Sequence, residues 1–168
     1  ISYVLDGALE HKDSMGNGRV LRPGQIQLMS AGTGVTHSEF NPLRDQTTHM
    51  LQVWLFPDRK NLEPSYTEWH PDPAKESDPK VLVISADGRE GSATIHQDAD
   101  IFRVRLPAGQ TMAHEIQPGR GVWLQLIKGC IEAHGTQLNP GDAFSTDDSG
   151  LLTITANEPA EALLFDLR

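Results

Sequence analysis

The sequence predicts an all-β fold made of two strand-rich halves. Its apolar residues fall in short runs rich in Val, Ile, Leu, Phe and Trp, and clusters of Gly, Pro, Asn and Asp separate these runs. No window has a sustained helical apolar period, so we expect at most a turn or two of helix, within 72–78. With 168 residues, the chain is long enough to bury one large core or two small ones.

The first half contains three predicted strands and one predicted hairpin. The strands are expected at 1–5, 25–29 and 49–56. The hairpin is expected around 13–18, DSMGNG, because its Gly and Asn residues favour a tight turn. We therefore expect His11, close to this hairpin tip, to be exposed. We expect Trp54, in the third run, to pack in the core.

A proline-rich segment, 57–79, separates the two halves. It has five prolines and many charges, and few apolar residues beyond Tyr66 and Trp69, so we expect a linker or crossing arm. Six further strands are expected in the second half, at 80–85, 92–96, 101–106, 122–129, 151–156 and 161–167.

The two halves have similar patterns. When Pro23-Gly24 is aligned with Pro140-Gly141, Gly7 falls on Gly129 if the hairpin is treated as an insertion in the first half. Downstream of the Pro-Gly pair the halves align without a gap. This pattern predicts an internal repeat, and hence two similar β-barrels.

The stretch GVTHSEFN, 34–41, carries the most distinctive polar pattern. In an extended chain His37, Glu39 and Asn41 lie on one face, because side chains alternate along a strand. An imidazole and a carboxylate are suitable ligands for divalent transition metals. In the repeat register His37 falls on Ile154 and Glu39 on Ala156, so we expect only the first half to carry this chemistry.

Composition limits the function classes. The net charge of −9 and the pI near 5.1 argue against nucleic acid as a direct ligand. No apolar run approaches the roughly 18 residues of a membrane span, and no signal-peptide pattern opens the chain. One cysteine, Cys130, excludes an internal disulfide and favours a reducing, cytoplasmic location. The sequence starts at Ile1 within a strand-like run, so we expect strand residues before it.

Two motifs resemble a known family. The spacing Gly34-x₂-His37-x₃-Asn41 resembles the second conserved motif of the cupin superfamily. YVLDGALEHKDSMGN followed by MSAGTGVTHSEFNP resembles the pirin family, especially bacterial pirin-like proteins with quercetinase activity. The likeness extends to LQVWLFP, IHQDADIFR and ALLFDL, so it covers nearly the whole chain.

This resemblance implies a bicupin, in which two jelly-roll type β-barrels are joined by the Pro-rich linker. The expected domains are an N-terminal barrel at 1–56 that lacks its first strands, the linker at 57–79, and a degenerate, metal-free C-terminal barrel at 80–168. In the second barrel only His114 falls near a ligand position.

The resemblance also implies a metal site in the first barrel. Pirins bind one metal through three histidines and one glutamate, and two of these ligands map onto His37 and Glu39. The other two belong to an H-x-H motif that is expected before Ile1 and is missing from this sequence. A metal held by His37 and Glu39 alone would be weakly bound. We expect a divalent transition metal, iron first, with nickel, copper, manganese, cobalt or zinc as alternatives.

The implied activity is cleavage of flavonols such as quercetin with O₂ and release of carbon monoxide. Glu39 is the candidate catalytic base for the flavonol 3-hydroxyl. Pocket or supporting roles are expected for Met29, Asn41, His49 and Gln52, although Asn41 also suits a cap of the turn into Pro42. Two alternatives are a non-enzymatic pirin-type metal-binding regulator that acts through a protein partner, and an inactive truncated relative. We expect a monomer.

Overall fold

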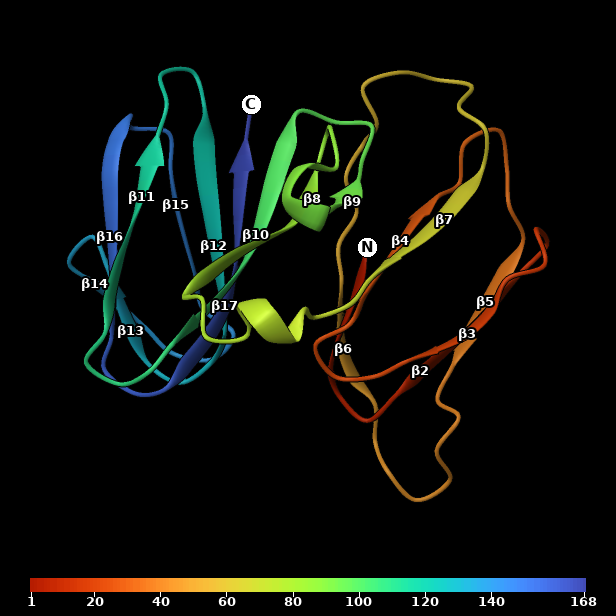
Figure 1. Cartoon of the computed structure of the whole chain (residues 1–168), viewed down its shortest axis with the longest axis horizontal. Helices are drawn as coiled ribbons and strands as arrows, with labels where there is room; N and C mark the ends of the chain where they lie inside the picture. The colour runs from red at the N-terminus through yellow and green to blue at the C-terminus, as the bar shows by residue number, and fades with distance from the viewer. The chain divides into compact units, whose positions relative to one another are not determined.

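The computed structural model describes residues 1–168 and contains no α-helix. Its only helical elements are two short 3-10 turns, η1 (Pro73–Lys75) and η2 (Arg89–Gly91). The predicted all-β fold is therefore confirmed, and η1 lies within 72–78, where the sequence predicts a turn. The chain divides into two compact units, residues 1–73 with 93–97, and residues 74–92 with 98–168 (Figure 1).

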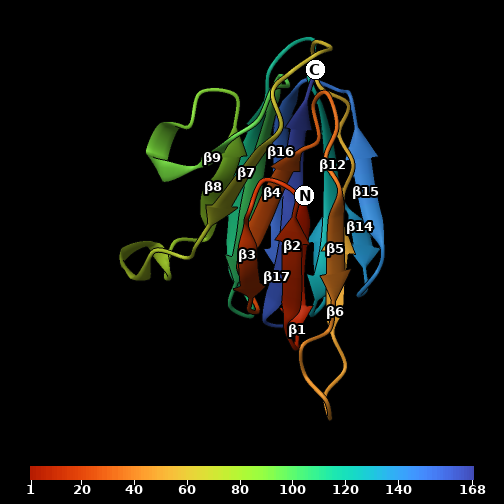
Figure 2. The same ribbon diagram turned by 90° about the vertical axis from the view of Figure 1, so that its right-hand side faces the viewer.

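The first unit is built from two antiparallel sheets that form two layers (Figure 1). Their strand orders are β6-β1-β4-β7 and β3-β2-β5, and Figure 2 shows β3, β2 and β5 side by side. The strands are β1 (Ser2–Asp6), β2 (Leu9–Asp13), β3 (Gly18–Leu21), β4 (Ile26–Ser30), β5 (His37–Phe40), β6 (His49–Gln52) and β7 (Ser65–Trp69). The short β9 (Ala93–Thr94) also belongs to this unit.

Strand β7 lies inside the segment 57–79, which the sequence predicts to be a linker. It pairs with β4 in a continuous antiparallel register, from Ile26 opposite Trp69 to Ser30 opposite Ser65. This part of the segment is therefore a sheet strand of the first unit. Its sequence signal is weak because a strand depends as much on the partner that it pairs with as on its own apolar content.

Strand β6 ends earlier than its apolar sequence suggests. The N–H of Val53 still donates to the carbonyl of Ile1, and the amino group of Ile1 donates to the carbonyl of Val53. The pairing between the two strands ends there. Trp54 and Phe56 follow, with exposed fractions of 85% and 89%. The prediction that Trp54 packs in the core is thus wrong, because the chain leaves the sheet before this side chain can be covered.

The second unit also has two antiparallel sheets. One has the order β15-β12-β17-β10-β8 and the other the order β11-β16-β13-β14. The strands are β8 (Lys80–Ser85), β10 (Ala99–Leu106), β11 (Thr111–Ile116), β12 (Gly121–Lys128), β13 (Ile131–Ala133), β14 (Thr136–Leu138), β15 (Ala143–Thr146), β16 (Gly150–Ala156) and β17 (Ala160–Leu167).

The interiors of the two units differ. A large apolar cluster fills the second unit, and Ile154 and Ala156 are completely buried in it. The corresponding apolar cluster of the first unit is small: Val4, Leu9 and Leu21, with Met50 packed against them. The rest of the first unit's inner face is therefore available to polar side chains.

The same glycine turn follows the first repeat strand in both units. Gly7 follows β1 and Gly129 follows β12, with φ of 75° and 80°. A Cβ on Gly7 would lie 2.4 Å from the carbonyl oxygen of Thr47, and a Cβ on Gly129 would lie 2.2 Å from that of Pro159. Thr47 and Pro159 both lie just before the last repeat strand of their unit, which supports the predicted repeat register.

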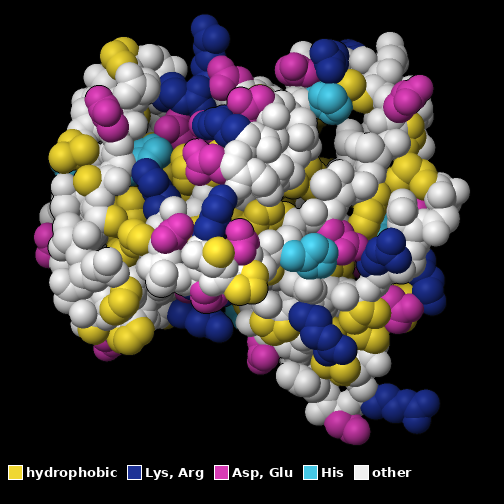
Figure 3. Space-filling model, in the orientation of Figure 1, with side chains coloured by type: hydrophobic (Ala, Val, Ile, Leu, Met, Phe, Trp, Pro, Cys, Tyr) yellow, Lys and Arg dark blue, Asp and Glu magenta, His cyan; other side chains and the backbone are white.

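Two features bear on the class of ligand: the distribution of charge on the surface and the presence of helices that could span a membrane. Acidic and basic side chains are intermixed on the face drawn in Figure 3, so that face carries no continuous basic patch. No helix of the structure has the length and apolar character needed to cross a membrane.

The glycine turn leads to a stability prediction. Gly129→Ala should lower the free energy of unfolding by about 2–4 kcal/mol, because the new Cβ adds a backbone clash to the cost of a left-handed alanine. Gly135→Ala is the matched control: its φ is also 80°, but no atom lies within 4 Å of the added Cβ, so it should lose only about 1 kcal/mol. Urea unfolding followed by circular dichroism measures both. Equal losses would contradict the prediction.

Candidate metal-binding site

The pairing of β5 with β2 brings the predicted ligands onto one face. Glu39 lies opposite His11, and His37 lies opposite Asp13. Side chains two residues apart on a strand point to the same side, so each strand contributes two polar groups to this face. The ring of His37 stacks on that of His11, with centroids 5.6 Å apart and planes inclined by 23°.

The carboxylate of Glu39 is held by two side-chain amides. Gln27 donates from Nε2 to Oε1 at 2.8 Å, and Gln52 donates from Nε2 to Oε2 at 2.9 Å. The hydroxyl of Ser2 adds a longer contact to Oε1, at 3.5 Å. With one amide on each oxygen, the carboxylate has a fixed orientation.

His11 is completely buried, with an exposed fraction of 0%, so the prediction that it is exposed is wrong. It shares the parity of Leu9, which faces the apolar cluster, and the hairpin tip begins only after Asp13. The Nδ1 atom of His11 lies 3.2 Å from the Gln27 amide nitrogen and 3.7 Å from Glu39 Oε1. Because the amide nitrogen can only donate, Nδ1 is the acceptor in this network.

The other ring nitrogen of His11 contacts Asp13. Nε2 lies 3.1 Å from Asp13 Oδ2, and with Nδ1 as acceptor it is Nε2 that carries the proton. Asp13 also accepts from the Asn17 amide at 2.8 Å and from the backbone N–H groups of Met15 and Asn17. Burial alone would raise the pKa of Asp13, but the bonds from Asn17, His11 and Met15 outweigh it and lower the pKa to about 2.

Tyr66 of β7 completes the polar face. Its ring lies 4.9 Å from that of His11, and its hydroxyl donates to Glu68 at 2.8 Å. Burial, and then the bond to Glu68, raises the pKa of the phenol well above its usual value, so the hydroxyl stays protonated and acts as a donor.

The other predicted site residues divide into two groups. Gln52 contacts Glu39, and Met29 has the same parity on β4 as Gln27, so both share the face of the ligands. The structure does not bring Asn41 or His49 to this face. The exposed Asn41 caps the following loop, with bonds to the carbonyl of Gln46 and the N–H of Leu43. His49 is exposed and three residues before Gln52, on the other side of β6.

His37 and Glu39 are the types of side chain that bind divalent transition metals. A neutral imidazole and an oriented carboxylate are typical ligands of such ions. No group of three or more His, Cys, Asp or Glu side chains in the chain is arranged to hold a metal ion, however. His37 and Glu39 therefore supply two donors, and a stable site needs more.

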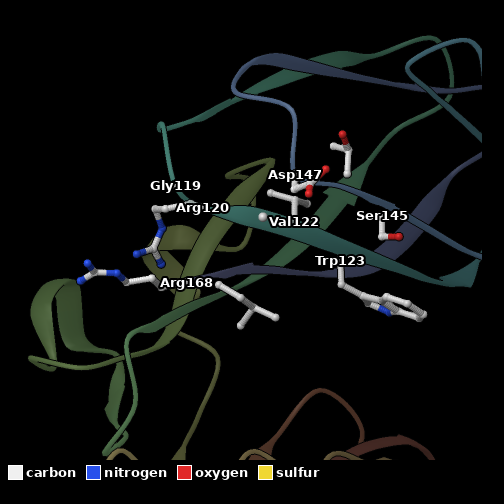
Figure 4. A pocket seen from close by; sticks show the side chains of 10 residues that line it. Gly119, Arg120, Val122, Trp123, Ser145, Asp147 and Arg168 are labelled. Carbon is white, nitrogen blue, oxygen red and sulfur yellow. The ribbon is translucent and has the colours of Figure 1, made fainter.

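A surface hollow of about 760 Å³ lies elsewhere, in the second unit (Figure 4). Its lining includes Arg120, Trp123, Ser145 and Arg168, and no histidine. Arg120 is already bonded to Asp98 and Asp166. The hollow contains none of the predicted site residues.

Two protein-family models match this chain, one in each half, and several known proteins resemble nearly all of it. A family model described as Pirin matches residues 1–55, and one described as Quercetinase C-terminal cupin domain matches residues 82–167. A quercetin 2,3-dioxygenase of Escherichia coli K12 is 38% identical over 99% of this chain and 71% of its own length. A pirin-like protein of Caulobacter vibrioides is 33% identical over 99% of this chain and 72% of its own.

Solved structures show the same similarity. YhhW from Escherichia coli superposes with a TM-score of 0.95 at 38% identity, covering 99% of this chain and 70% of that one. A crystal structure described as the bacterial pirin YhhW in complex with nickel(II) superposes with a TM-score of 0.92 at 37% identity, with the same coverage.

The amide of Gln27 leads to a second prediction. Gln27→Leu should lower the free energy of unfolding by about 1–3 kcal/mol, because Glu39 Oε1 and His11 Nδ1 both lose a buried donor. Gln110→Leu, at an exposed glutamine, should change it by less than about 0.5 kcal/mol. Urea unfolding measures both variants, and a loss no greater in Gln27→Leu than in Gln110→Leu would contradict the prediction.

The low pKa of Asp13 leads to a third prediction. A carboxyl whose folded pKa is about 2, against an ordinary 3.8, stabilises the fold above pH 4, and this contribution is lost as the pH falls toward 2. Asp13→Asn should therefore be less stable at pH 7 and lose less stability between about pH 4 and pH 2. Urea midpoints at a series of pH values test this. Asp45→Asn, in an exposed loop, should follow the parent protein, and parent-like behaviour of Asp13→Asn would contradict the prediction.

Proposed function

Because this chain belongs to the pirin family, we propose that it functions as a metal-dependent dioxygenase that cleaves flavonols such as quercetin. One structural observation carries the proposal. His37 and Glu39 project from the inner face of β5, and amides of Gln27 and Gln52 fix both oxygens of the carboxylate. The relative named quercetin 2,3-dioxygenase supports the choice of substrate class.

In this proposal His37 and Glu39 are two ligands of one divalent metal. The nickel(II) complex of YhhW shows that a relative binds a transition metal, which makes nickel a candidate beside iron. When bound, the metal would supply the site at which a flavonol anion and O₂ meet. His11, stacked on the His37 ring and tied to Asp13, would hold His37 in place.

Glu39 has a second proposed role, as the base that accepts the proton of the flavonol 3-hydroxyl. Its Oε1 faces the buried amide of Gln27, while Oε2 faces the exposed side chain of Gln52. A substrate arriving from solvent would therefore reach Oε2 first. Met29, half-buried on the same face, would contribute to an apolar wall for an aromatic substrate. A cytoplasmic location and a monomeric state stay predictions.

The decisive assay follows loss of quercetin absorbance and release of carbon monoxide. The natural full-length protein would be stripped of metal with a chelator and reloaded with nickel, iron or copper. We expect turnover with at least one ion and none after stripping. Stoichiometric metal binding without turnover under any ion would refute the enzymatic function, and would favour a metal-binding regulator that acts on a protein partner.

Variants at the two ligands form a further prediction. His37→Ala should abolish stoichiometric metal binding and turnover, and Glu39→Gln should lower kcat by roughly 100-fold or more, because it removes the anionic ligand and base. Isothermal titration with the metal and steady-state kinetics measure the two effects. His134→Asn, at an exposed turn histidine of the second unit, should behave like the parent protein. Full metal binding by His37→Ala would show that the site lies elsewhere.

A further inference from the structure

The second unit contains a chain of titratable side chains that the proposed function does not use. Lys80 is the first residue of β8, and its Nζ lies 3.2 Å from Nδ1 of His114 on β11. The Nε2 atom of the same ring lies 2.8 Å from Oδ2 of Asp166 on β17. His114 and Asp166 are 5% and 6% exposed, and Lys80 is half-buried. Three strands thus place a lysine, a histidine and an aspartate in series.

The direction of each hydrogen bond follows from the donors available. An ammonium group can only donate, so Nδ1 of His114 accepts from Lys80, and Nε2–H donates to Asp166. Arg120 fixes the carboxylate in turn: its Nε donates to Asp166 Oδ1, and its Nη2 donates to the Asp166 carbonyl oxygen at 2.9 Å. The histidine therefore presents an unprotonated nitrogen to the amine, and a carboxylate stands behind it.

We propose that Lys80 is a reactive amine that is acylated by small thioesters, with His114 as its proton acceptor and Asp166 as the group that holds His114. The proposal is independent of the dioxygenase function of the first unit. It is also confined to one unit, since all of its residues lie between 74 and 168, outside 93–97.

The surroundings favour the neutral amine. Burial lowers the pKa of the Lys80 amine below its usual value, and the negative charges of Asp166 and Glu90 only partly oppose this. The Nζ atom also lies 5.1 Å above the ring of Phe102, which excludes water from one side. Burial lowers the pKa of His114 as well, opposed by its bond to Asp166, so the ring is neutral at neutral pH.

The reaction balances without any further reactant. The neutral Lys80 amine attacks the thioester carbonyl carbon, and a C–N bond forms. Nδ1 of His114 accepts one proton from the attacking nitrogen, and Asp166 stabilises the imidazolium. The C–S bond then breaks, and the departing thiolate takes that proton from His114 and leaves as a thiol. The product is an uncharged amide at Lys80.

The test compares lysines within one protein. The natural full-length protein is incubated with S-acetyl-N-acetylcysteamine at neutral pH, and mass spectrometry follows acetylation of each lysine with time. Lys80 should react roughly threefold faster or more than the exposed Lys128, because His114 is positioned to accept a proton from its amine. This comparison needs no variant, so a Lys80 rate equal to or below that of Lys128 overturns the proposal.

One variant separates the role of the base from simple exposure. His114→Asn keeps a hydrogen-bonding side chain but removes the base. It should lower the Lys80 rate to that of Lys128 without changing the rate at Lys128, with folding checked by circular dichroism. If the folded variant acetylates Lys80 as fast as the parent protein, His114 plays no part and the proposal fails.

Discussion

The two-residue period of strand side chains is the constraint on which the rest of this structure depends. Each strand of a two-layered unit has one inner face, so the parity of a residue decides whether it meets the interior or solvent. In the first unit His11, Gln27 and Glu39 have inward parity and form one network through the Gln27 amide. A shift of one residue in the pairing of β2 with β5 would place His11 and Glu39 on opposite faces of the sheet, and the site would not form.

The two units show opposite uses of the same architecture. The positions that correspond to His37 and Glu39 are Ile154 and Ala156, both within the apolar core of the second unit. The polar groups that remain inside that unit, His114 and Asp166, bond to each other and to Lys80 and Arg120. The buried carboxylate of Asp166 is thus paired with a guanidinium, whereas Glu39 in the first unit accepts from the uncharged side chains of Gln27, Gln52 and Ser2.

Sequence pattern was sufficient for the all-β fold, the repeat register and the parity of His37 and Glu39, because each of these depends on local alternation or on turn glycines. It was not sufficient for His11 or Gln27, because their burial depends on which strands pair across the sheet. The spacing of His11 and Asp13, two residues apart with the parity of Leu9, was the one local sign of an inward histidine. Trp54 was misjudged for the opposite reason, since an apolar run does not show where a ladder ends.

The carboxylate of Asp13 ties a surface turn to the interior. It accepts from Asn17 and from the N–H of Met15 on one side and from His11 on the other. The exposed residue Met15 is therefore free to change in identity during divergence, whereas Gly16 has a φ of 95°, which favours glycine. The number of residues between Asp13 and Asn17 is not free, because one more or fewer would pull the carboxylate away from the buried ring. Relatives should thus differ in the amino-acid identities of this hairpin far more than in its length.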